Sequence, residues 1–441
     1  MTTDINPKLA QTITQSRPYP EIGWVNEVVG LIVETTGPVA KVGDICQIEL
    51  NNGSNQRIEA EVVGFKPGKL LLMPYGDITA LSPGCKVINT GRPCQVGVGP
   101  HLLGRIIDPF GRPLDQRSKP PTDAYAPMDA VAPEPMARPL IEEPLALGIR
   151  AIDGLITVGR GQRLGIFAGS GVGKSTLMGM MCRQATADIN VIALVGERGR
   201  EVREFVEQNL GPEGLARSVV VVATSEQPPL MKIKAALAAT AIAEYFRDSG
   251  QDVLLMMDSL TRVAMALREV GLSVGEPPTS RGYTPSVFTF LPRLLERSGT
   301  TQAGSITGLY TVLVEGDDFN EPISDAVRGI LDGHIALSRA LAQQNHFPSI
   351  DVLESISRCM VNITRPEHQR AAGLVRDALA TYRESEDLIN IGAYVRGTNT
   401  ALDKAIQVKK AVDAFLKQEQ QEYSDFADIV DQLLKFGQQL Q

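Results

Sequence analysis

A run of small residues followed by lysine and serine has the composition of a phosphate-binding loop. It is Ala168-Gly169-Ser170-Gly171-Val172-Gly173-Lys174-Ser175. The glycines let the backbone turn tightly, so that successive N–H groups point at phosphate oxygens. Lys174 is expected to reach the β- and γ-phosphates, and Ser175 to offer its hydroxyl to Mg²⁺. Ala168 replaces the usual first glycine, which is a small change.

The flanking sequence supplies the context that such a loop needs. The apolar run 163–167 predicts a strand before the loop, and residues 176–181 predict a helix after it. A helix start adds partial positive charge at the phosphates. A plain Gly/Ser turn that binds nothing is the alternative, and these flanks argue against it. The residues expected to bind the nucleotide are Gly169, Ser170, Gly171, Val172, Gly173, Lys174, Ser175 and Thr176.

An acidic residue ends a second apolar run, Val253–Asp258. The run follows an amphipathic stretch, 230–247, and has the form of a buried parallel strand ending at the carboxyl edge of a sheet. Asp258 is then expected to hold Mg²⁺ together with Ser175. The alternative is that Asp258 caps a helix that begins near Ser259.

A third apolar run, 191–195, leads into Gly196, Glu197 and Arg198. A hydrolase needs a carboxylate near the γ-phosphate to orient the attacking water. Glu197 is the candidate for that role, with Arg198 beside it to position or neutralise charge. Glu197 could instead pair with Arg200 or Arg203 at a helix start.

Arg358 is the candidate for a fourth role. Phosphoryl-transfer transition states are stabilised by an arginine that comes from outside the P-loop region or from a neighbouring subunit. Arg358 ends the segment 347–358, although composition alone would make it one surface arginine among many.

These segments together resemble the rotary ATPase catalytic subunits, which are F/V-type P-loop ATPases. The closer resemblance is to the flagellar and type III secretion export ATPases. It extends from about residue 23 to about residue 406 and is strongest in the segments Gly196–Phe205, Glu315–Ile323, Asp332–Ile335 and Asp387–Tyr394. It implies an α/β fold with a RecA-like P-loop ATPase core, an N-terminal β-barrel and a C-terminal helical domain.

The resemblance also implies roles for individual residues. Lys174, Glu197, Arg198 and Arg358 correspond to catalytic residues, with Arg358 reaching into the next subunit's site. Ser175 and Asp258 correspond to the metal-binding residues, so the implied cofactors are ATP and Mg²⁺. Phe347 falls where relatives place an aromatic ring against adenine, although an ordinary core position is the alternative. His346 is expected to be structural.

One chain carries both the P-loop residues and the arginine finger, which synthases divide between two kinds of subunit. The resemblance therefore implies a homo-oligomer, expected to be a hexameric ring. Other implied partners are a stator protein at the N-terminus, a central stalk protein facing the loop 271–283, export substrates with their chaperones, and the membrane export gate. For the loop, a plain surface role is the alternative.

Composition limits the other classes of function. The chain has 441 residues, 43% hydrophobic and 21% charged, as in an ordinary soluble globular protein. A net charge of −8 argues against nucleic acid as the main partner. Its five cysteines form no Cys-x-x-Cys pair, which favours reduced thiols in the cytosol. Residues 1–20 lack the pattern of a signal peptide. We expect a cytoplasmic protein, peripheral at the inner face of the cell membrane.

The pattern along the chain predicts four parts. Residues 1–22 form a tail, and 23–95 form a β-barrel in which 28–33, 45–50, 58–63 and 70–73 are strands. Residues 96–366 form the ATPase core, entered through a proline-rich connector, 120–139. Residues 367–441 are helical, with helices over 371–384, 402–420 and 426–434.

The favoured function is Mg²⁺-dependent ATP hydrolysis that energises protein export through a type III apparatus, flagellar before virulence-type. The segments 391–399 and 73–77 favour the flagellar form. A ring nucleic-acid motor and a non-catalytic ring subunit are the alternatives from other classes. A synthase catalytic subunit is a near relative.

Overall fold

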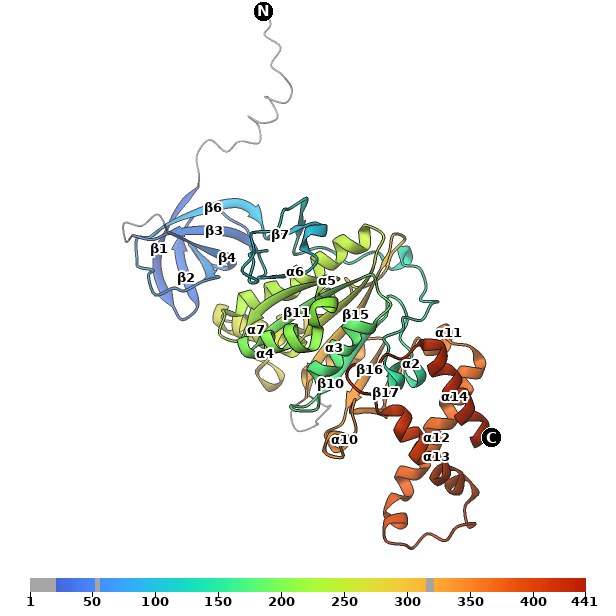
Figure 1. Ribbon diagram of the computed structural model, residues 1–441. Coiled ribbons are helices and arrows are strands. Elements are labelled where there is room, and N and C mark those ends of the chain that lie inside the picture. Colours follow the sequence, from blue (N-terminus) through green and yellow to red (C-terminus); the bar gives the residue numbers. More distant parts are fainter. Residues whose placement is uncertain (1–20, 52–55, 315–320) are drawn as a thin grey trace, which may run out of the picture. The chain divides into compact units, whose positions relative to one another are not determined.

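The computed structural model describes residues 21–51, 56–314 and 321–441 (Figure 1). The expected tail lies outside the described residues except for its last two positions, and so does most of the segment Glu315–Ile323. The described chain forms two compact units. One contains the β-barrel, and the other consists of residues 95–269 and 277–441.

The first unit is a closed barrel with the strand order β1-β2-β5-β4-β3-β6. Alternate side chains, such as Val33, Ile48 and Val62, fill its interior, as a period of two requires. The sequence predicted one strand over 28–33, and this prediction is wrong. Gly30, with a φ of +59°, turns the chain between two strands. The strands are β1 Ile22–Val29, β2 Ile32–Thr36, β3 Asp44–Glu49, β4 Arg57–Lys66, β5 Lys69–Pro74 and β6 Lys86–Pro93.

The second unit is built on a mostly parallel sheet with the order β17-β16-β10-β15-β13-β11-β12-β8. Its central strands are apolar on both faces, because helices cover both. Only β17 on this path runs antiparallel to its neighbour, β16. The strands are β8 Arg105–Ile107, β10 Arg163–Ala168, β11 Ile189–Glu197, β12 Ser218–Thr224, β13 Asp252–Asp258, β15 Ser305–Leu313, β16 Gly333–Leu337 and β17 Ile350–Ser357.

Short strands accompany this sheet. β14 (Gly299–Thr300) pairs with β15, and β7 (Gln95–Val98) pairs with β9 (Ala124–Pro127). The proline-rich connector is therefore partly a strand, and it also contains the 3₁₀ turn η2, Pro135–Ala137. Another 3₁₀ turn, η1, spans Pro100–Leu102.

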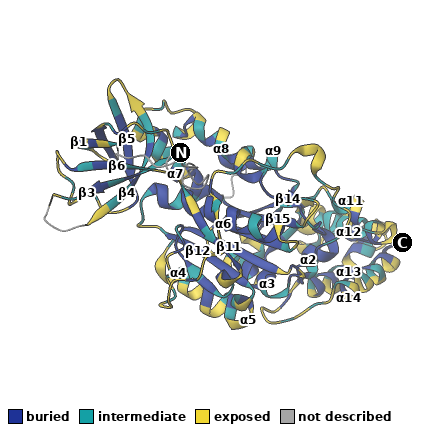
Figure 2. Cartoon of the chain, turned by 90° about the horizontal axis from the view of Figure 1, so that it is seen from above, coloured by how far each residue is buried: buried dark blue, intermediate teal, exposed yellow. Residues whose placement is uncertain are grey.

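Helices enclose the sheet from two sides. Side chains of α3 share one core with Ile192, Leu194 and Met256, whereas α6 contacts β11, β12 and β13, whose alternate residues are also buried. Figure 2 shows β11 largely in the colour of buried residues between helices that carry exposed ones. The helical segments are α2 Arg150–Leu155, α3 Lys174–Gln184, α4 Gly199–Glu204, the π-helical turn η3 Phe205–Leu210, α5 Gly211–Ala216, α6 Pro229–Asp248, α7 Leu260–Val274, η4 Ser280–Gly282, α8 Pro285–Leu295, α9 Pro322–Ile330, α10 Arg339–Gln343 and α11 Met360–Ile363.

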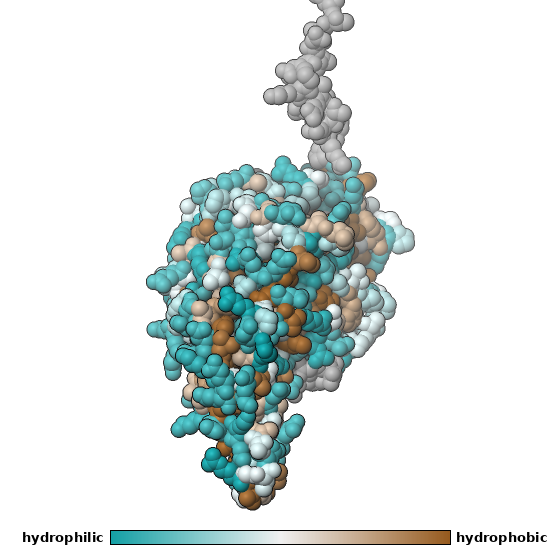
Figure 3. All heavy atoms as spheres, turned by 90° about the vertical axis from the view of Figure 1, so that its right-hand side faces the viewer, coloured by the Kyte–Doolittle hydropathy of each residue, from teal (hydrophilic) through white to brown (hydrophobic). Residues whose placement is uncertain are grey.

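Three helices end the chain: α12 Pro366–Asn390, α13 Thr400–Leu416 and α14 Phe426–Leu440. They contact α2 and join the same apolar core through Val375, Val412 and Leu433. The second helix stops at Leu416, short of the predicted 420, because Gln418 instead bonds Arg150 and Gly148. Figure 3 shows a largely hydrophilic face with separate hydrophobic patches.

Across the described ranges of the chain, none of the helices has both the length and the apolar character needed to cross a membrane. All five cysteines are free.

Candidate active site

The P-loop joins the end of β10 to the start of α3, as the sequence predicted. Gly171 and Gly173 have φ values of +78° and +85°, a conformation that favours glycine. Ala168 is buried as the last residue of β10, and its carbonyl accepts a hydrogen bond from the Val314 N–H at 3.1 Å. The sheet therefore fixes Ala168 where it begins the lining of the cleft.

Three charged side chains meet at the end of the loop. The Lys174 ammonium forms an ion pair with Asp258 and lies 3.8 Å from the Glu197 carboxylate. These residues end β13 and β11 and begin α3, so the carboxyl edge of the sheet brings them together. All three side chains are at most 13% exposed, which strengthens their electrostatic interactions.

Asp258 is held by the sheet and not by a helix cap. The Thr311 hydroxyl on β15 donates a hydrogen bond of 2.7 Å to its carboxylate. The same carboxylate binds Lys174. The Arg262 N–H in the first turn of α7 donates to the Ser259 hydroxyl at 3.3 Å, so Ser259 and not the Asp258 side chain bonds that helix start.

Glu197 lies in an environment that favours its neutral form. Burial and, next, the nearby Asp258 carboxylate raise the pKa of Glu197 to about 7 against the attraction of Lys174. The alternative partner Arg203 pairs instead with Glu207 at 2.8 Å. A carboxyl that titrates near neutral pH suits general base catalysis.

A cleft of about 920 Å³ opens over these residues. Its outer part is rich in groups that sequence reasoning missed. Arg262 is one of them: it lies in the first turn of α7, which begins at Leu260, and its attraction opposes the rise in the pKa of Glu197. Gly196 allows this approach, because a Cβ there would lie 3.1 Å from the Arg262 side chain. The other missed lining residues include Glu201, Arg268, Arg281, Tyr283, Glu321 and Arg339.

Spacing relative to Asp258 is the signal that could have identified Arg262, since it lies one helical turn further on. Four of the remaining lining residues lie in segments that the resemblance had singled out without assigning them to this site: Glu201, Arg281, Tyr283 and Glu321. Arg268 and Arg339 come from segments that no motif marked.

A second cavity of about 590 Å³ lies on the other side of the P-loop. Phe347 lines it together with Gly171, Gly173 and Thr176. Phe347 is 41% exposed, so it is not an ordinary core residue. The opposite wall is the segment 417–420 with Glu422, which the sequence gave no reason to expect there. His346 next to Phe347 is buried, and burial lowers the pKa of its imidazole.

The structure does not bring Arg358 to this cleft. β17 pairs Ser357 with Gly333 at the beginning of β16, whereas the end of β10 pairs with Leu337 at the end of β16. Arg358 thus follows β17 at the sheet edge where β10 starts, separated from the P-loop by a strand length of roughly 17 Å. Arg198 does line the cleft, but its side chain is 77% exposed and pairs with Glu201 at 3.1 Å.

The oxygen groups at the loop fit Mg²⁺. In the described ranges, no cluster of at least three His, Cys, Asp or Glu side chains could hold a metal by itself. Mg²⁺ is usually bound by one or two carboxylates together with substrate phosphates and water. The Ser175 hydroxyl and the Asp258 carboxylate provide hard oxygen ligands of that kind beside the phosphate cradle.

Comparison with known proteins agrees with this geometry. The ATP synthase alpha/beta family matches twice, with its nucleotide-binding domain at residues 148–357 and its beta-barrel domain at residues 25–91. The T3SS EscN ATPase C-terminal domain matches residues 364–435. The flagellum-specific ATP synthase of Bacillus subtilis is 57% identical over 93% of this chain and 94% of its own.

The chain belongs to the flagellar and type III secretion ATPase family. The type 3 secretion system ATPase of Xanthomonas euvesicatoria is 50% identical over 98% of this chain and 96% of its own length. The assembled ATPase EscN of the enteropathogenic E. coli type III secretion system matches with a TM-score of 0.89 and 46% identity. That match covers 94% of this chain and all of EscN as solved.

This export ATPase therefore binds and hydrolyses ATP, and the predicted α/β fold with an N-terminal barrel and a C-terminal helical region is confirmed. Family membership also favours type III export over the nucleic-acid motor and the non-catalytic subunit.

Proposed function

We propose that this ATPase hydrolyses Mg-ATP at sites shared between neighbouring subunits of a homo-hexameric ring, and that it energises flagellar protein export. The observation that carries the proposal is the meeting of Lys174, Asp258 and Glu197 at one sheet edge while Arg358 lies at the opposite edge. A single chain thus holds both halves of a site that only a neighbour can complete.

Each residue has a role that follows from its place. Backbone N–H groups of Gly169–Gly173 and the Lys174 ammonium bind the phosphates, and Ser175 with Asp258 hold Mg²⁺. Bound Mg²⁺ offsets negative charge on the phosphates. On ATP binding, Lys174 leaves Asp258 for the phosphates. Glu197 orients the attacking water, with Arg198 beside it, and the neighbour's Arg358 stabilises the transition state.

Phe347 and the P-loop bind the nucleotide from its other side. The second cavity places the Phe347 ring next to Gly173, where an adenine ring attached to the bound phosphates would lie. Stacking on an exposed aromatic face suits a purine base.

The wider assembly is proposed from relatives. EscN is solved in an assembled form and also in complex with its central stalk EscO. By analogy, this chain forms a ring that takes a stalk protein near residues 271–283. It also meets a stator protein at its N-terminus, export substrates with chaperones, and the export gate at the inner face of the membrane. Family matches at 25–91, 148–357 and 364–435 support the division 1–22, 23–95, 96–366 and 367–441.

The test of the active site is Lys174→Ala, with Lys119→Ala as a control at an exposed lysine just before the connector. Lys174→Ala should abolish Mg²⁺-dependent phosphate release and weaken binding of a fluorescent ATP analogue, whereas Lys119→Ala should change neither. Normal hydrolysis by Lys174→Ala would refute the P-loop assignment.

The choice between flagellar and virulence-type export is tested in the cell that carries the gene. Replacing Glu197 by Gln on the chromosome should remove flagellar filaments. Filaments that persist while secretion of effector proteins stops would transfer the assignment to a virulence-type apparatus. The flagellar relative from Bacillus subtilis supports the first outcome.

A further inference from the structure

The backbone that carries Arg358 is tied to the start of β10. Its N–H donates a hydrogen bond of 2.9 Å to the carbonyl of Asp332, the residue before β16. Asp332 in turn donates its own N–H to the Arg163 carbonyl at 2.9 Å. Arg358 itself is exposed. An exposed side chain thus projects from a backbone position that two strands fix.

Gln162 adds a second connection at the same place. Its side chain is completely buried, and its amide nitrogen donates to both the Asp332 carbonyl and the Ser357 hydroxyl, each at 3.0 Å. Its amide oxygen accepts from the Gly159 N–H at 2.8 Å. Both polar atoms of this amide are therefore hydrogen-bonded. Two of the bonds hold Asp332, which binds the Arg358 N–H, and Ser357, which precedes Arg358 in the chain.

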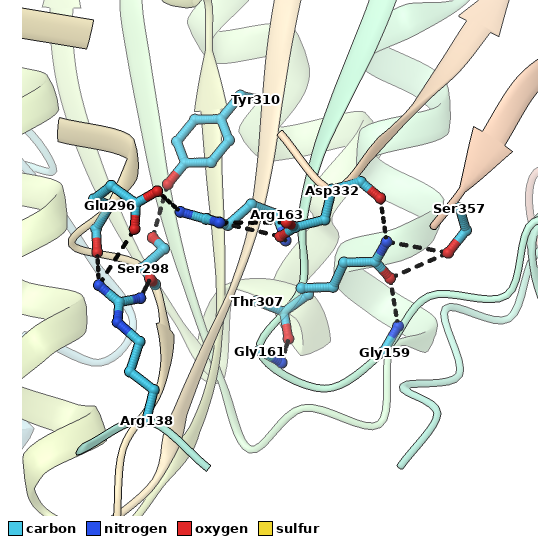
Figure 4. A network of polar contacts seen from close by, with 11 residues as sticks. Arg138, Gly159, Gly161, Arg163, Glu296, Ser298, Thr307, Tyr310, Asp332 and Ser357 are labelled. Carbon is cyan, nitrogen blue, oxygen red and sulfur yellow. Dashed lines mark hydrogen bonds and ion pairs between the residues drawn. The ribbon is translucent and has the colours of Figure 1, made fainter. Parts of the chain in front are cut away.

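Charged groups reinforce the attachment (Figure 4). The Asp332 carboxylate accepts from the Arg163 backbone N–H and guanidinium, both at 3.1 Å. The same guanidinium pairs with Glu296 at 2.5 Å, and Glu296 pairs with Arg138 at 3.5 Å. Figure 4 shows the successive contacts from Arg138 through Glu296 and Arg163 to Asp332. The Arg138 and Arg163 side chains are only 17% and 15% exposed, so their contacts resist displacement of the strand end.

Gly333 explains how closely the strands meet here. A Cβ on Gly333 would lie 2.2 Å from the Ile356 carbonyl oxygen, so only glycine admits this approach. Its φ of +147° is also one that other residues rarely adopt. Asp332 therefore binds the backbone of Arg358, and Gly333 leaves room for the end of β17 to approach β16.

We propose that Gln162, Arg163 and Asp332 are positioning residues for Arg358, which set where its guanidinium meets the nucleotide of the neighbouring subunit. None of the three lines the cleft of its own subunit. They occupy the opposite sheet edge, so they can affect hydrolysis through the finger that they hold. The inference rests on the proposed function of Arg358 in trans.

The test uses Gln162→Met, which keeps the length of the side chain and removes its hydrogen bonds. Ser357→Ala is a milder second variant should Gln162→Met fail to fold. Ser298→Ala is the matched control, because its hydroxyl bonds Tyr310 at 2.7 Å in the same region and does not contact Asp332. The measurements are kcat, binding of a fluorescent ATP analogue, and activity after mixing with other variants.

The expected result for Gln162→Met is a kcat at least about tenfold lower, since small misplacements of a catalytic group are costly. Ser357→Ala should lower kcat less, and Ser298→Ala should not lower it. ATP-analogue affinity should stay unchanged. Mixing Gln162→Met with Lys174→Ala should restore turnover, because the second chain offers an intact finger to the first chain's intact P-loop. Mixing it with Arg358→Ala should restore none.

The opposite complementation pattern would overturn the inference, because it would place the defect at the P-loop of the mutated chain. Unchanged kcat in Gln162→Met and Ser357→Ala would overturn it too. The proposed function fails separately: Arg358→Ala would then keep full turnover, or would not be restored by Lys174→Ala. If Arg358→Ala loses turnover and is restored by Lys174→Ala, but Gln162→Met keeps its kcat, then Arg358 acts in trans and the positioning role of Gln162 is wrong.

Discussion

One cation and two carboxylates share the buried end of the P-loop. Lys174 pairs directly with Asp258, and Glu197 is left at 3.8 Å from the same ammonium. Burial and the Asp258 carboxylate together raise the pKa of Glu197 to about 7. The protonation state of Glu197 therefore changes near neutral pH.

The first prediction is a pH profile. The role proposed for Glu197 requires its carboxylate form, so kcat/KM should increase as pH rises through about 7 and level off above it. The profile of kcat/KM reports the free enzyme, in which this pKa applies. It should be measured from about pH 5.5 to about 8.5. A level profile across neutral pH would argue against Glu197 as the base.

The second prediction is that Glu197→Gln separates binding from hydrolysis. Glutamine keeps the shape of the side chain but cannot accept a proton from water, so turnover should fall by roughly 10²- to 10⁴-fold. Affinity for an ATP analogue should persist, since Lys174 and the loop remain. Glu207→Gln is a suitable control, because Glu207 is exposed and pairs only locally with Arg203. A variant that still hydrolyses ATP normally would remove Glu197 from the mechanism.

The sequence predicted the site residues that belong to local motifs, and it missed those that reach the site from distant segments of the chain. Lys174, Glu197 and Asp258 each follow an apolar run, and the parallel sheet aligns such run ends without further information. Arg339 and the wall at 417–420 reach the nucleotide region from segments far along the chain. No local pattern records that approach.

Among the elements, the central strands were predictable because burial on both faces makes them continuously apolar. The barrel strands were harder, since a half-buried strand alternates and a tight turn can hide inside an apolar run. Gly30 shows this, because it splits 28–33 into the ends of β1 and β2. β6 was missed for the opposite reason: it ends in polar and exposed residues.

A buried ion pair connects elements around the sheet and gives the third prediction. Arg297, 2% exposed, pairs with Glu244 of α6 at 2.6 Å and also donates to the Met128 carbonyl. Removing one partner leaves an uncompensated buried charge, which costs about 3–5 kcal/mol. Glu244→Leu should therefore lower Tm by roughly 10 °C in a unit of this size.

The double variant Glu244→Leu/Arg297→Met supplies the control, because it removes both charges. It should recover most of the lost Tm. Thermal unfolding followed by circular dichroism measures both. If the double variant is less stable than Glu244→Leu, the ion pair does not account for the effect.

For the whole molecule, the decisive feature is the separation of Arg358 from its own P-loop. One strand length lies between them, and β10 spans that length within a rigid sheet. An isolated subunit then has a complete P-loop and an exposed Arg358 that lies a strand length away from it. Head-to-tail association around a closed ring would bring the Arg358 of each subunit to the P-loop of its neighbour.

The last prediction is that turnover per subunit depends on protein concentration. Because a monomer lacks an arginine finger at its own site, dilution below the assembly range should lower turnover per subunit by roughly 10³-fold or more, the usual worth of such a residue. Arg358→Ala should show that low turnover at every concentration, and Glu197→Gln should keep its own roughly 10²- to 10⁴-fold loss at every concentration. Steady-state phosphate release measured beside the oligomeric state at each concentration decides the matter. Full turnover by a species with the size of a monomer would contradict a site completed in trans. If Arg358 completes the neighbour's site, turnover should fall together with the assembled fraction.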